Sequence, residues 1–261
     1  MVGILKPEIL LTNDDGCDSP LLLPLARTLA KVANLHVIAP ASGMSGVSHA
    51  FTGASGVELR PVSGDYPFDF YSLSGTPADC TKFGLRKLFG EKKMDCVISG
   101  PNAGENSGVS SLYSGTVAGA REAALWGIPG MALSLADIHA PKMLDELCRF
   151  AAEVVEKRLF EKIPAHGIWN VNYPDETRFD FRGYRVARQE LSMFTDHYDE
   201  RDGKFYLGGW KEPEGFAEGS DDSLLEKGFA TITPLSIDQT FDGALSSLET
   251  LLQTDFKKQA D

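Results

Sequence analysis

Three polar clusters in the sequence contain the residue types that bind metal ions and phosphate groups. They are Thr12 to Gly16 (TNDDG), Ser42 to Gly46 (SGMSG) and Ser99 to Gly104 (SGPNAG). Each cluster follows a short apolar run that predicts a buried strand. Ligands of open α/β sheets bind beyond the carboxyl ends of the strands, so the three clusters are expected to meet in one crevice.

The adjacent aspartates Asp14 and Asp15 predict a cation site. Neighbouring carboxylates repel each other unless positive charge lies between them. Neutral oxygens from Ser45 and Asn102 complete a set of ligands that contains only oxygen, and such a set favours Mg²⁺ or Mn²⁺ over zinc. One divalent cation per subunit is therefore expected, held by these four residues. Bound there, it would act as a Lewis acid and a template on a phosphoryl oxygen.

The residues around this predicted cation are suited to hold a phosphate. Glycines flank all three clusters, and backbone without side chains can approach a phosphate closely and point N–H groups at it. The segment Leu112 to Thr116 directly precedes a predicted helix, and a helix N-terminus attracts anions. Ser114 in this segment, and Asn106 and Ser107 before it, are therefore candidate phosphate contacts.

Metal-assisted hydrolysis of a phosphate ester is the reaction that these groups predict. In the favoured mechanism the cation binds a phosphoryl oxygen and orients a water for in-line attack, with Asp14 or Asp15 as the base. Asn106, Ser114 and backbone N–H groups would stabilise the developing charge. A covalent aspartyl-phosphate is the competing mechanism, and it ranks lower because both carboxylates are more useful as ligands.

Each cluster taken by itself has a simpler structural interpretation. Asp-Asp-Gly after a strand is often a turn with a helix cap, and Asn102 between glycines is typical of a left-handed turn. The coincidence of three clusters at three strand ends favours catalysis. His49 is a weaker candidate for a general base, because a lone histidine in a polar loop is more often a surface or supporting residue.

Two further classes of function stay open at this point. A dinucleotide or nucleotide-sugar enzyme would use the same kind of sheet, but the first strand leads into Asp-Asp-Gly rather than a Gly-x-Gly-x-x-Gly phosphate cradle. A non-catalytic sensor would bind a nucleotide or metal through the same residues without releasing phosphate.

Short apolar runs alternate with helical patterns over the first two-thirds of the chain, which predicts βα units around a mostly parallel sheet. The predicted strands are 8–13, 35–39, one or two near 57–74, 94–99, 130–135 and 168–172, and the predicted helices are 20–32, 76–89, 115–126 and 142–159. Helix 115–126 is rich in small residues and is expected to pack closely on the sheet. Residues 1–178 would form this α/β catalytic core.

The last third of the chain has a different composition. Residues 179–228 are charged and glycine-rich, and an Asp202-Gly203 turn between alternating residues predicts a protruding hairpin. The acidic side chains of this region are expected to form a solvated face, with the alternative that one of them lines the mouth of the active site: Asp196, Asp199, Glu200, Asp221 and Asp222. Residues 229–261 return to an apolar strand and a helix, whose apolar stripe contains Leu245, Leu248, Leu252 and Phe256.

The overall composition restricts the class of partner. The 261 residues carry a net charge of −12, whereas a nucleic-acid polymer is bound by a basic surface, so no such partner is expected. No apolar run reaches 18 residues, and no membrane association is expected. The four cysteines form no metal-ligand pattern. These features are typical of a cytoplasmic protein with a small-molecule substrate.

The motifs, taken in order, resemble the SurE family, the stationary-phase survival proteins that are 5′/3′-nucleotidases. They are LLTNDDG (10–16), SGVSH (45–49), GTPADC (75–80), SGPNAGEN (99–106), LYSGTVAGAREAA (112–124), NVNYP (170–174) and ITPL (232–235). Such a series over nearly the whole chain is far more specific than any single motif. The resemblance implies hydrolysis of nucleoside 5′-monophosphates, with 3′-monophosphates as further substrates.

The resemblance also implies site residues and a fold. By position, the metal ligands of the family correspond to Asp14, Asp15, Ser45 and Asn102, and its phosphate pocket corresponds to Gly46, Ser48, Asn106 and Ser114. The implied fold is a Rossmann-like, three-layer α/β/α core with a protruding β-hairpin. A swapped C-terminal element, residues 229–261, would complete this core or a neighbouring subunit in a homodimer or homotetramer. Family members commonly carry an Asp-Arg-x-Arg segment before the motif serine, whereas this chain has Ala41 to Met44 (ASGM).

Overall fold

The computed structural model describes residues 5–137 and 139–255. Its centre is a nine-stranded sheet with the strand order β3-β4-β2-β1-β5-β6-β7-β11-β8. The strands are β1 (Glu8–Thr12), β2 (Asn34–Pro40), β3 (Leu59–Pro61), β4 (Asp69–Leu73), β5 (Cys96–Ala103), β6 (Gly130–Leu135), β7 (Gly167–Tyr173), β8 (Tyr184–Val186) and β11 (Ala230–Ser236). Neighbouring strands are parallel except in the pairs β3 with β4 and β7 with β11, so the predicted mostly parallel sheet is confirmed.

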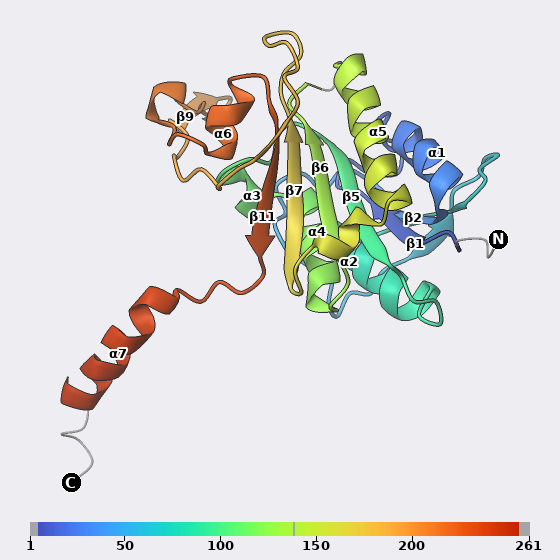
Figure 1. Ribbon diagram of the computed structural model, residues 1–261, viewed down its shortest axis with the longest axis horizontal. Coiled ribbons are helices and arrows are strands. Elements are labelled where there is room, and N and C mark those ends of the chain that lie inside the picture. Colours follow the sequence, from blue (N-terminus) through green and yellow to red (C-terminus); the bar gives the residue numbers. More distant parts are fainter. Residues whose placement is uncertain (1–4, 138, 256–261) are drawn as a thin grey trace.

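Helices cover both faces of the sheet and give the molecule three layers (Figure 1). On one face α1 (Leu22–Val32) packs with α5 (Pro141–Glu156), and on the other α2 (Pro77–Phe83) packs with α4 (Gly115–Leu125). The shorter helical segments are η1 (Gly84–Leu88), α3 (Ser110–Tyr113), η2 (Leu159–Lys162), η3 (Pro213–Gly215) and α6 (Asp221–Leu225). The predicted α/β/α architecture is therefore confirmed.

The side chains of β1 show why helices must cover both faces of the sheet. Ile9 and Leu11 belong to the core that the sheet forms with α1 and α5, whereas Leu10 belongs to the core on the side of α2. All three side chains are fully buried. Because successive side chains of a strand point to opposite faces, a continuous apolar run is stable only where helices cover the sheet on both sides.

The strands that precede the three polar clusters lie side by side. β2, β1 and β5 are neighbours and run parallel, so their carboxyl ends share one edge of the sheet. β5 extends further than the predicted strand 94–99 and reaches Ala103, with an irregular register between Ser99 and Asn102. The three clusters therefore meet at one edge, as the sequence predicts.

Helix α4 approaches the sheet closely, as its small residues predict. A Cβ atom at Gly119 would lie 2.6 Å from Ser99 Oγ and 3.0 Å from Thr12 Cγ2, which is too close for a side chain there. Both contacts belong to strands that end at the polar clusters. The absence of a side chain at Gly119 therefore allows the N-terminus of α4 to reach the ends of β1 and β5.

Residues 179–228 form the predicted hairpin but also contribute to the sheet. β9 (His197–Arg201) and β10 (Lys204–Gly208) pair antiparallel around the Asp202-Gly203 turn, where both residues have positive φ angles. In contrast, β8 pairs with β11 at the sheet edge, and α6 packs on β11 and β7. The expected boundary at residue 178 therefore does not separate the hairpin region from the core.

The C-terminal segment leaves the body of the molecule after β11 (Figure 1). β11 pairs with β7 of the same chain and so extends its own sheet. α7 (Asp242–Asp255) lies apart from the sheet, and Leu245, Leu248 and Leu252 are 49%, 54% and 50% exposed. Phe256 of the predicted apolar stripe lies outside the described residues.

Among the residues that the structure describes, no helix is both long and apolar enough to cross a membrane. The four cysteines are free thiols, and three of them, Cys80, Cys96 and Cys148, are buried. Burial raises the pKa of each of these three thiols. They are therefore unreactive core residues.

Candidate active site

A cavity of about 320 Å³ lies where the three polar clusters meet. Its lining combines residues that follow β1, β2 and β5 with residues near the N-terminus of α4. The lining residues are Asp14, Ser45, Gly46, Asn102, Ala103, Gly104, Glu105, Asn106, Ser110, Tyr113, Ser114 and Phe194. All predicted site residues except Asp15, Ser48 and Ser107 are therefore brought together in this lining.

Asp14 is held against the N-terminus of α4. Its carboxylate accepts a hydrogen bond from the backbone N–H of Thr116 at 3.1 Å and a second one from the Thr116 hydroxyl. The residue is only 3% exposed. Burial raises the pKa of Asp14 and repulsion from Asp15 adds to this shift, while the hydrogen bonds from Thr116 oppose it. Gly115 makes room for the carboxylate, because a Cβ atom there would lie 2.9 Å from Asp14 Cβ.

Asp15 connects the ends of β1 and β5, and Asn102 lies near the end of β5. One carboxylate oxygen of Asp15 accepts a hydrogen bond from the backbone N–H of Ala103 at 3.0 Å. Burial raises the pKa of Asp15 as well. Asn102 donates a side-chain N–H to the carbonyl of Gly104 at 2.6 Å, which leaves its amide oxygen for a ligand.

The charges around this cavity favour a cation. Its charged lining residues are Asp14 and Glu105, and the described lining contains no lysine or arginine. A divalent ion beside the aspartate pair would stabilise both carboxylates, whose pKa values are raised without it. Within residues 5–137 and 139–255, no three His, Cys, Asp or Glu side chains gather in metal-binding geometry. Such an ion would therefore also depend on the neutral oxygens of Ser45 and Asn102.

Asn106 and Ser114 offer polar groups to the cavity from buried positions. The backbone N–H of Asn106 donates to Asn172 Oδ1 at 2.7 Å, and its side-chain N–H donates to Ser134 Oγ at 2.9 Å. Ser114 caps α4, and its hydroxyl oxygen accepts from the N–H of Val117 at 3.1 Å. A capping hydroxyl keeps its own hydrogen, so the Ser114 hydroxyl can bind an anion at this helix N-terminus. The N–H groups of Thr116 and Val117 are already bonded to Asp14 and Ser114.

Ser48 and His49 stabilise the loop after β2 instead of lining the cavity. The Ser48 hydroxyl donates to the carbonyl of Leu112 at 2.7 Å. His49 Nε2 lies 3.0 Å from a carboxylate oxygen of the buried Glu122. These contacts join the loop that carries Ser45 to α3 and α4. The Ser48 hydroxyl is thus engaged by the protein itself.

The sequence model of the family described as Survival protein SurE matches residues 9–196. This match covers more than half of the chain and includes all three polar clusters. The chain belongs to the SurE family.

Relatives of this SurE chain match it over nearly its full length. The 5′-nucleotidase SurE of Fervidobacterium nodosum is 36% identical over 250 residues, which are 93% of this chain and 96% of that protein. The 5′-nucleotidase SurE of Aquifex aeolicus is 36% identical over 254 residues, which are 94% of this chain and 98% of that protein. The crystal structure of the SurE protein from Aquifex aeolicus matches with a TM-score of 0.80 at 32% identity, covering 94% of this chain and 99% of that one. The family resemblance seen in the motifs is therefore confirmed.

Residues 41–44 of this SurE chain contact the site through the backbone. The segment contains no basic side chain, in contrast to the Asp-Arg-x-Arg segment that the resemblance implies. The N–H of Met44 donates to the carbonyl of Asp14 at 2.7 Å. Gly16 has a φ angle of +95°, and a Cβ atom there would lie 3.1 Å from the carbonyl carbon of Ser42. The segment therefore lies close to Asp14 and adds no positive charge.

Asp221 and Asp222 are buried in this chain, so the prediction of a solvated face is wrong for these two residues. They are 0% and 4% exposed. Asp221 accepts from the N–H of Gly108 at 2.9 Å, and Asp222 accepts from the Ser107 hydroxyl and from Lys211 Nζ at 2.8 Å. These bonds anchor the loop that begins at the cavity. The other acidic residues of that prediction are exposed: Asp196, Asp199 and Glu200.

Glu105 and Phe194 line the cavity and do not belong to the site that the sequence predicts. Glu105 lies in the SGPNAGEN motif, directly beside Asn106, and this position in the sequence indicates that Glu105 lies near the site. Phe194 lies in a segment without a motif. Protein surrounds the Glu105 carboxyl and raises its pKa by burial, although the residue is exposed to the cavity.

Proposed function

We propose that this chain is a divalent-metal-dependent 5′-nucleotidase, which hydrolyses nucleoside 5′-monophosphates to nucleoside and phosphate. One observation carries the proposal: the cavity at the strand ends offers Asn106, Ser114 and a helix N-terminus to a phosphate, but no basic side chain in its described lining. A phosphate dianion would face Asp14 and Glu105 there unless a cation neutralised them. The SurE proteins of Fervidobacterium nodosum and Aquifex aeolicus are named 5′-nucleotidases, which supports the same activity here.

A divalent cation held by Asp14, Asp15, Ser45 and Asn102 would supply Lewis-acid polarisation of a phosphoryl oxygen and a template for the attacking water. The chain itself provides the other groups that contact the phosphate. The Asn106 amide, which Ser134 holds in place at 2.9 Å, and the Ser114 hydroxyl with the α4 N-terminus bind the other phosphate oxygens as charge develops.

The aspartate pair also accepts the proton of the attacking water. Their part as a base follows from their position beside the proposed cation, because burial raises the pKa of both carboxylates only until a bound cation lowers it again. The alternative in which an aspartate attacks phosphorus is less favourable, because both carboxylates are more useful as ligands of the proposed cation. Detection of a phosphorylated aspartate by mass spectrometry would contradict this preference.

The proposal predicts release of inorganic phosphate from nucleoside 5′-monophosphates with Mg²⁺ or Mn²⁺ present. Release from 3′-monophosphates is expected as well, because the groups proposed here contact the phosphate, which both isomers carry. A panel of 5′- and 3′-monophosphates assayed for phosphate with each metal ion tests both expectations. If the folded protein bound these nucleotides without releasing phosphate under any of these conditions, a nucleotide sensor would replace the enzyme as the proposed function.

We also propose that the chain forms a homodimer in which α7 of one chain packs on the other chain. α7 lies apart from its own sheet with its leucines about half exposed, and each leucine buried in a contact contributes about 1.5–3 kcal/mol. The exposed hairpin β9–β10 is the candidate surface for a homotetramer. Light scattering is expected to give at least a dimer for the full chain and a monomer after deletion of residues 241–261. A monomeric full chain would contradict the proposal.

A cytoplasmic location belongs to the same proposal. The four cysteines form no disulfide, and disulfides are rare in reducing compartments. Recovery of the protein from the extracellular or membrane fraction of the cells that produce it naturally would contradict this location.

A further inference from the structure

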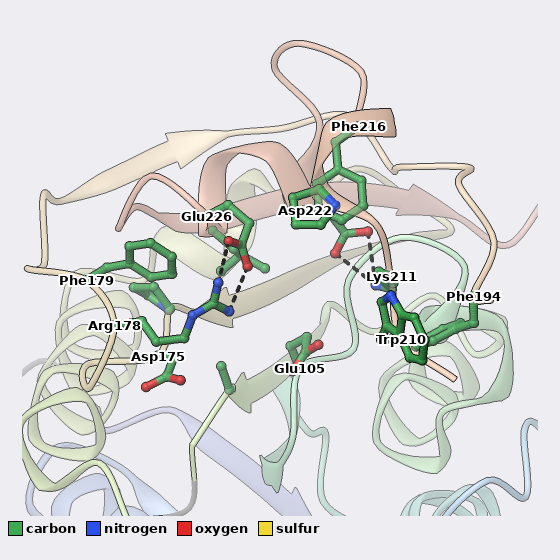
Figure 2. Close-up of a pocket in the computed structure, with 14 residues that line it drawn as sticks. Glu105, Asp175, Arg178, Phe179, Phe194, Trp210, Lys211, Phe216, Asp222 and Glu226 are labelled. Atoms are coloured by element: carbon green, nitrogen blue, oxygen red, sulfur yellow. Dashed lines mark hydrogen bonds and ion pairs between the residues drawn. The ribbon is translucent and has the colours of Figure 1, made fainter. Parts of the chain in front are cut away.

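A second cavity of about 310 Å³ adjoins the candidate active site. Glu105 and Phe194 line both cavities, so the two cavities border each other at these residues. Figure 2 shows Arg178 and Glu226 on one side of the second cavity and Trp210 and Phe194 on the other, with Glu105 between them. Its volume lies within the range of about 300–1,000 Å³ that is usual for small-molecule sites.

Aromatic side chains form one wall of this second cavity. Trp210, which follows β10, leaves 60% of its surface exposed. Phe194 lies beside it in Figure 2, and Lys211 Nζ lies 5.3 Å from the centre of the Phe194 ring. An exposed indole at the mouth of a cavity is a ready surface for a planar ring, because nucleic-acid bases stack on aromatic side chains.

The positive charges of the second cavity are already paired. Arg178 donates two hydrogen bonds to the carboxylate of Glu226, at 3.0 and 2.7 Å. Lys211 Nζ lies 2.8 and 3.0 Å from the two carboxylate oxygens of Asp222. The lining also contains Glu105 and Asp175, so its acidic side chains exceed its basic ones. A second phosphate group would therefore meet net negative charge here.

We propose that this second cavity binds the nucleoside part of a nucleoside monophosphate, with the base against Trp210 and Phe194. The inference rests on the proposed function, which places the phosphate in the adjoining cavity. Glu105 lies where the two cavities meet, and no side chain among the described residues donates a hydrogen bond to its carboxylate. The carboxylate accepts hydrogen bonds from the sugar hydroxyls of a nucleotide that spans both cavities.

The arrangement gives the site a preference among phosphate compounds. A monophosphate places its ring on the aromatic wall and its phosphate beside the aspartate pair, whereas the extra phosphates of a diphosphate or triphosphate face the carboxylates of Glu105 and Asp175. Compounds without a base lose the aromatic contact. The preferred substrates are therefore nucleoside monophosphates, ahead of ADP, ATP and simple sugar phosphates.

The test compares the kcat/KM for AMP with that for ribose 5-phosphate, which has the same sugar phosphate without the base. Trp210→Ala is expected to lower the ratio of these two values about 5-fold to 150-fold, the range that one stacked base supplies. Phe205→Ala is the matched control, because Phe205 is 67% exposed in β10 and lies outside the cavity lining. The control is expected to leave the ratio unchanged.

Adenosine binding supplies a readout that does not need hydrolysis. Adenosine is expected to quench the tryptophan fluorescence of the native protein, and Trp210→Ala is expected to abolish the quenching. Glu105→Gln is expected to narrow the difference in kcat/KM between AMP and 2′,3′-dideoxy-AMP. Trp210→Ala could hydrolyse AMP with an unchanged ratio of the kcat/KM values for AMP and ribose 5-phosphate, and adenosine could quench its fluorescence as in the wild type. That result would overturn the nucleoside site alone. Quenching by adenosine without hydrolysis of any nucleotide would overturn the proposed function and leave the nucleoside site supported.

Discussion

Asp14→Asn is expected to reduce metal-dependent phosphate release from AMP by at least about 10³-fold. The substitution removes a charged ligand of the proposed cation, and a metal ion contributes several kcal/mol to stabilising transition-state charge, at about 1.4 kcal/mol for each factor of ten. Asparagine keeps the shape of the side chain. Its amide oxygen accepts from the Thr116 N–H, and its amide N–H donates to the Thr116 hydroxyl oxygen, so the local contacts survive. Steady-state phosphate release with saturating Mg²⁺ or Mn²⁺ measures the loss.

The same substitution is expected to raise the free energy of unfolding in metal-free buffer at pH 7. Burial raises the pKa of Asp14 in the folded state, so ionising this carboxyl at neutral pH costs stability that a neutral amide does not cost. This gain in the free energy of unfolding should shrink as the pH falls through the raised pKa of Asp14, because the wild-type carboxyl then becomes neutral too. Asp18→Asn is the matched control, since Asp18 is exposed and outside the cavity lining. Full activity of Asp14→Asn would rule out this carboxylate as a ligand.

Lys211→Met is expected to lower the free energy of unfolding by about 3–5 kcal/mol, the usual cost of removing one partner from a buried ion pair. Lys211 and Asp222 have side-chain exposures of 8% and 4%, and Lys211 Nζ also donates to the carbonyl of Ser107 at 3.2 Å. Without the ammonium group, the Asp222 carboxylate keeps only the Ser107 hydroxyl among these partners. Urea denaturation followed by circular dichroism measures the change.

The matched control for this prediction is Arg60→Met. The Arg60–Glu58 pair has side-chain exposures of 76% and 71%, so its loss is expected to change stability by less than about 1 kcal/mol. Adding Asp222→Asn to Lys211→Met should recover part of the stability, because it removes the unpaired buried charge. A loss below about 1 kcal/mol in Lys211→Met would show that this pair does not anchor the loop beside Asn106.

The core of the fold could be predicted from local patterns. Three local patterns are each satisfied by a parallel sheet that helices cover on both faces. They are the apolar run of β1, the alternation of strands with amphipathic helices, and the small residues of α4. The boundary at residue 178 did not follow from the sequence, because the three-residue strand β8 and the five-residue helix α6 are too short to give a periodic signal. Their pairing with β11 depends on contacts between distant parts of the chain.

The candidate site was predictable where its residues follow strands. Asp14, Ser45, Asn102 and Asn106 lie in motifs at strand ends, and topology alone brings such motifs together. Asp222 was assigned to a solvated face because an acidic pair in a charged segment usually lies at the surface. Its burial depends on Lys211, which is close in sequence but in a segment without periodicity. The aromatic wall at Trp210 is likewise a product of tertiary packing, which no local pattern indicates.

The central claim is that a divalent cation at the aspartate pair makes this cavity a phosphatase of nucleoside monophosphates. The most direct test measures phosphate release from AMP by the metal-stripped full-length protein while Mn²⁺ or Mg²⁺ is returned in steps. The account predicts no release from the stripped protein and a rate that rises to saturation as the free metal concentration increases. Full activity in the stripped protein, with chelator present throughout, would contradict it.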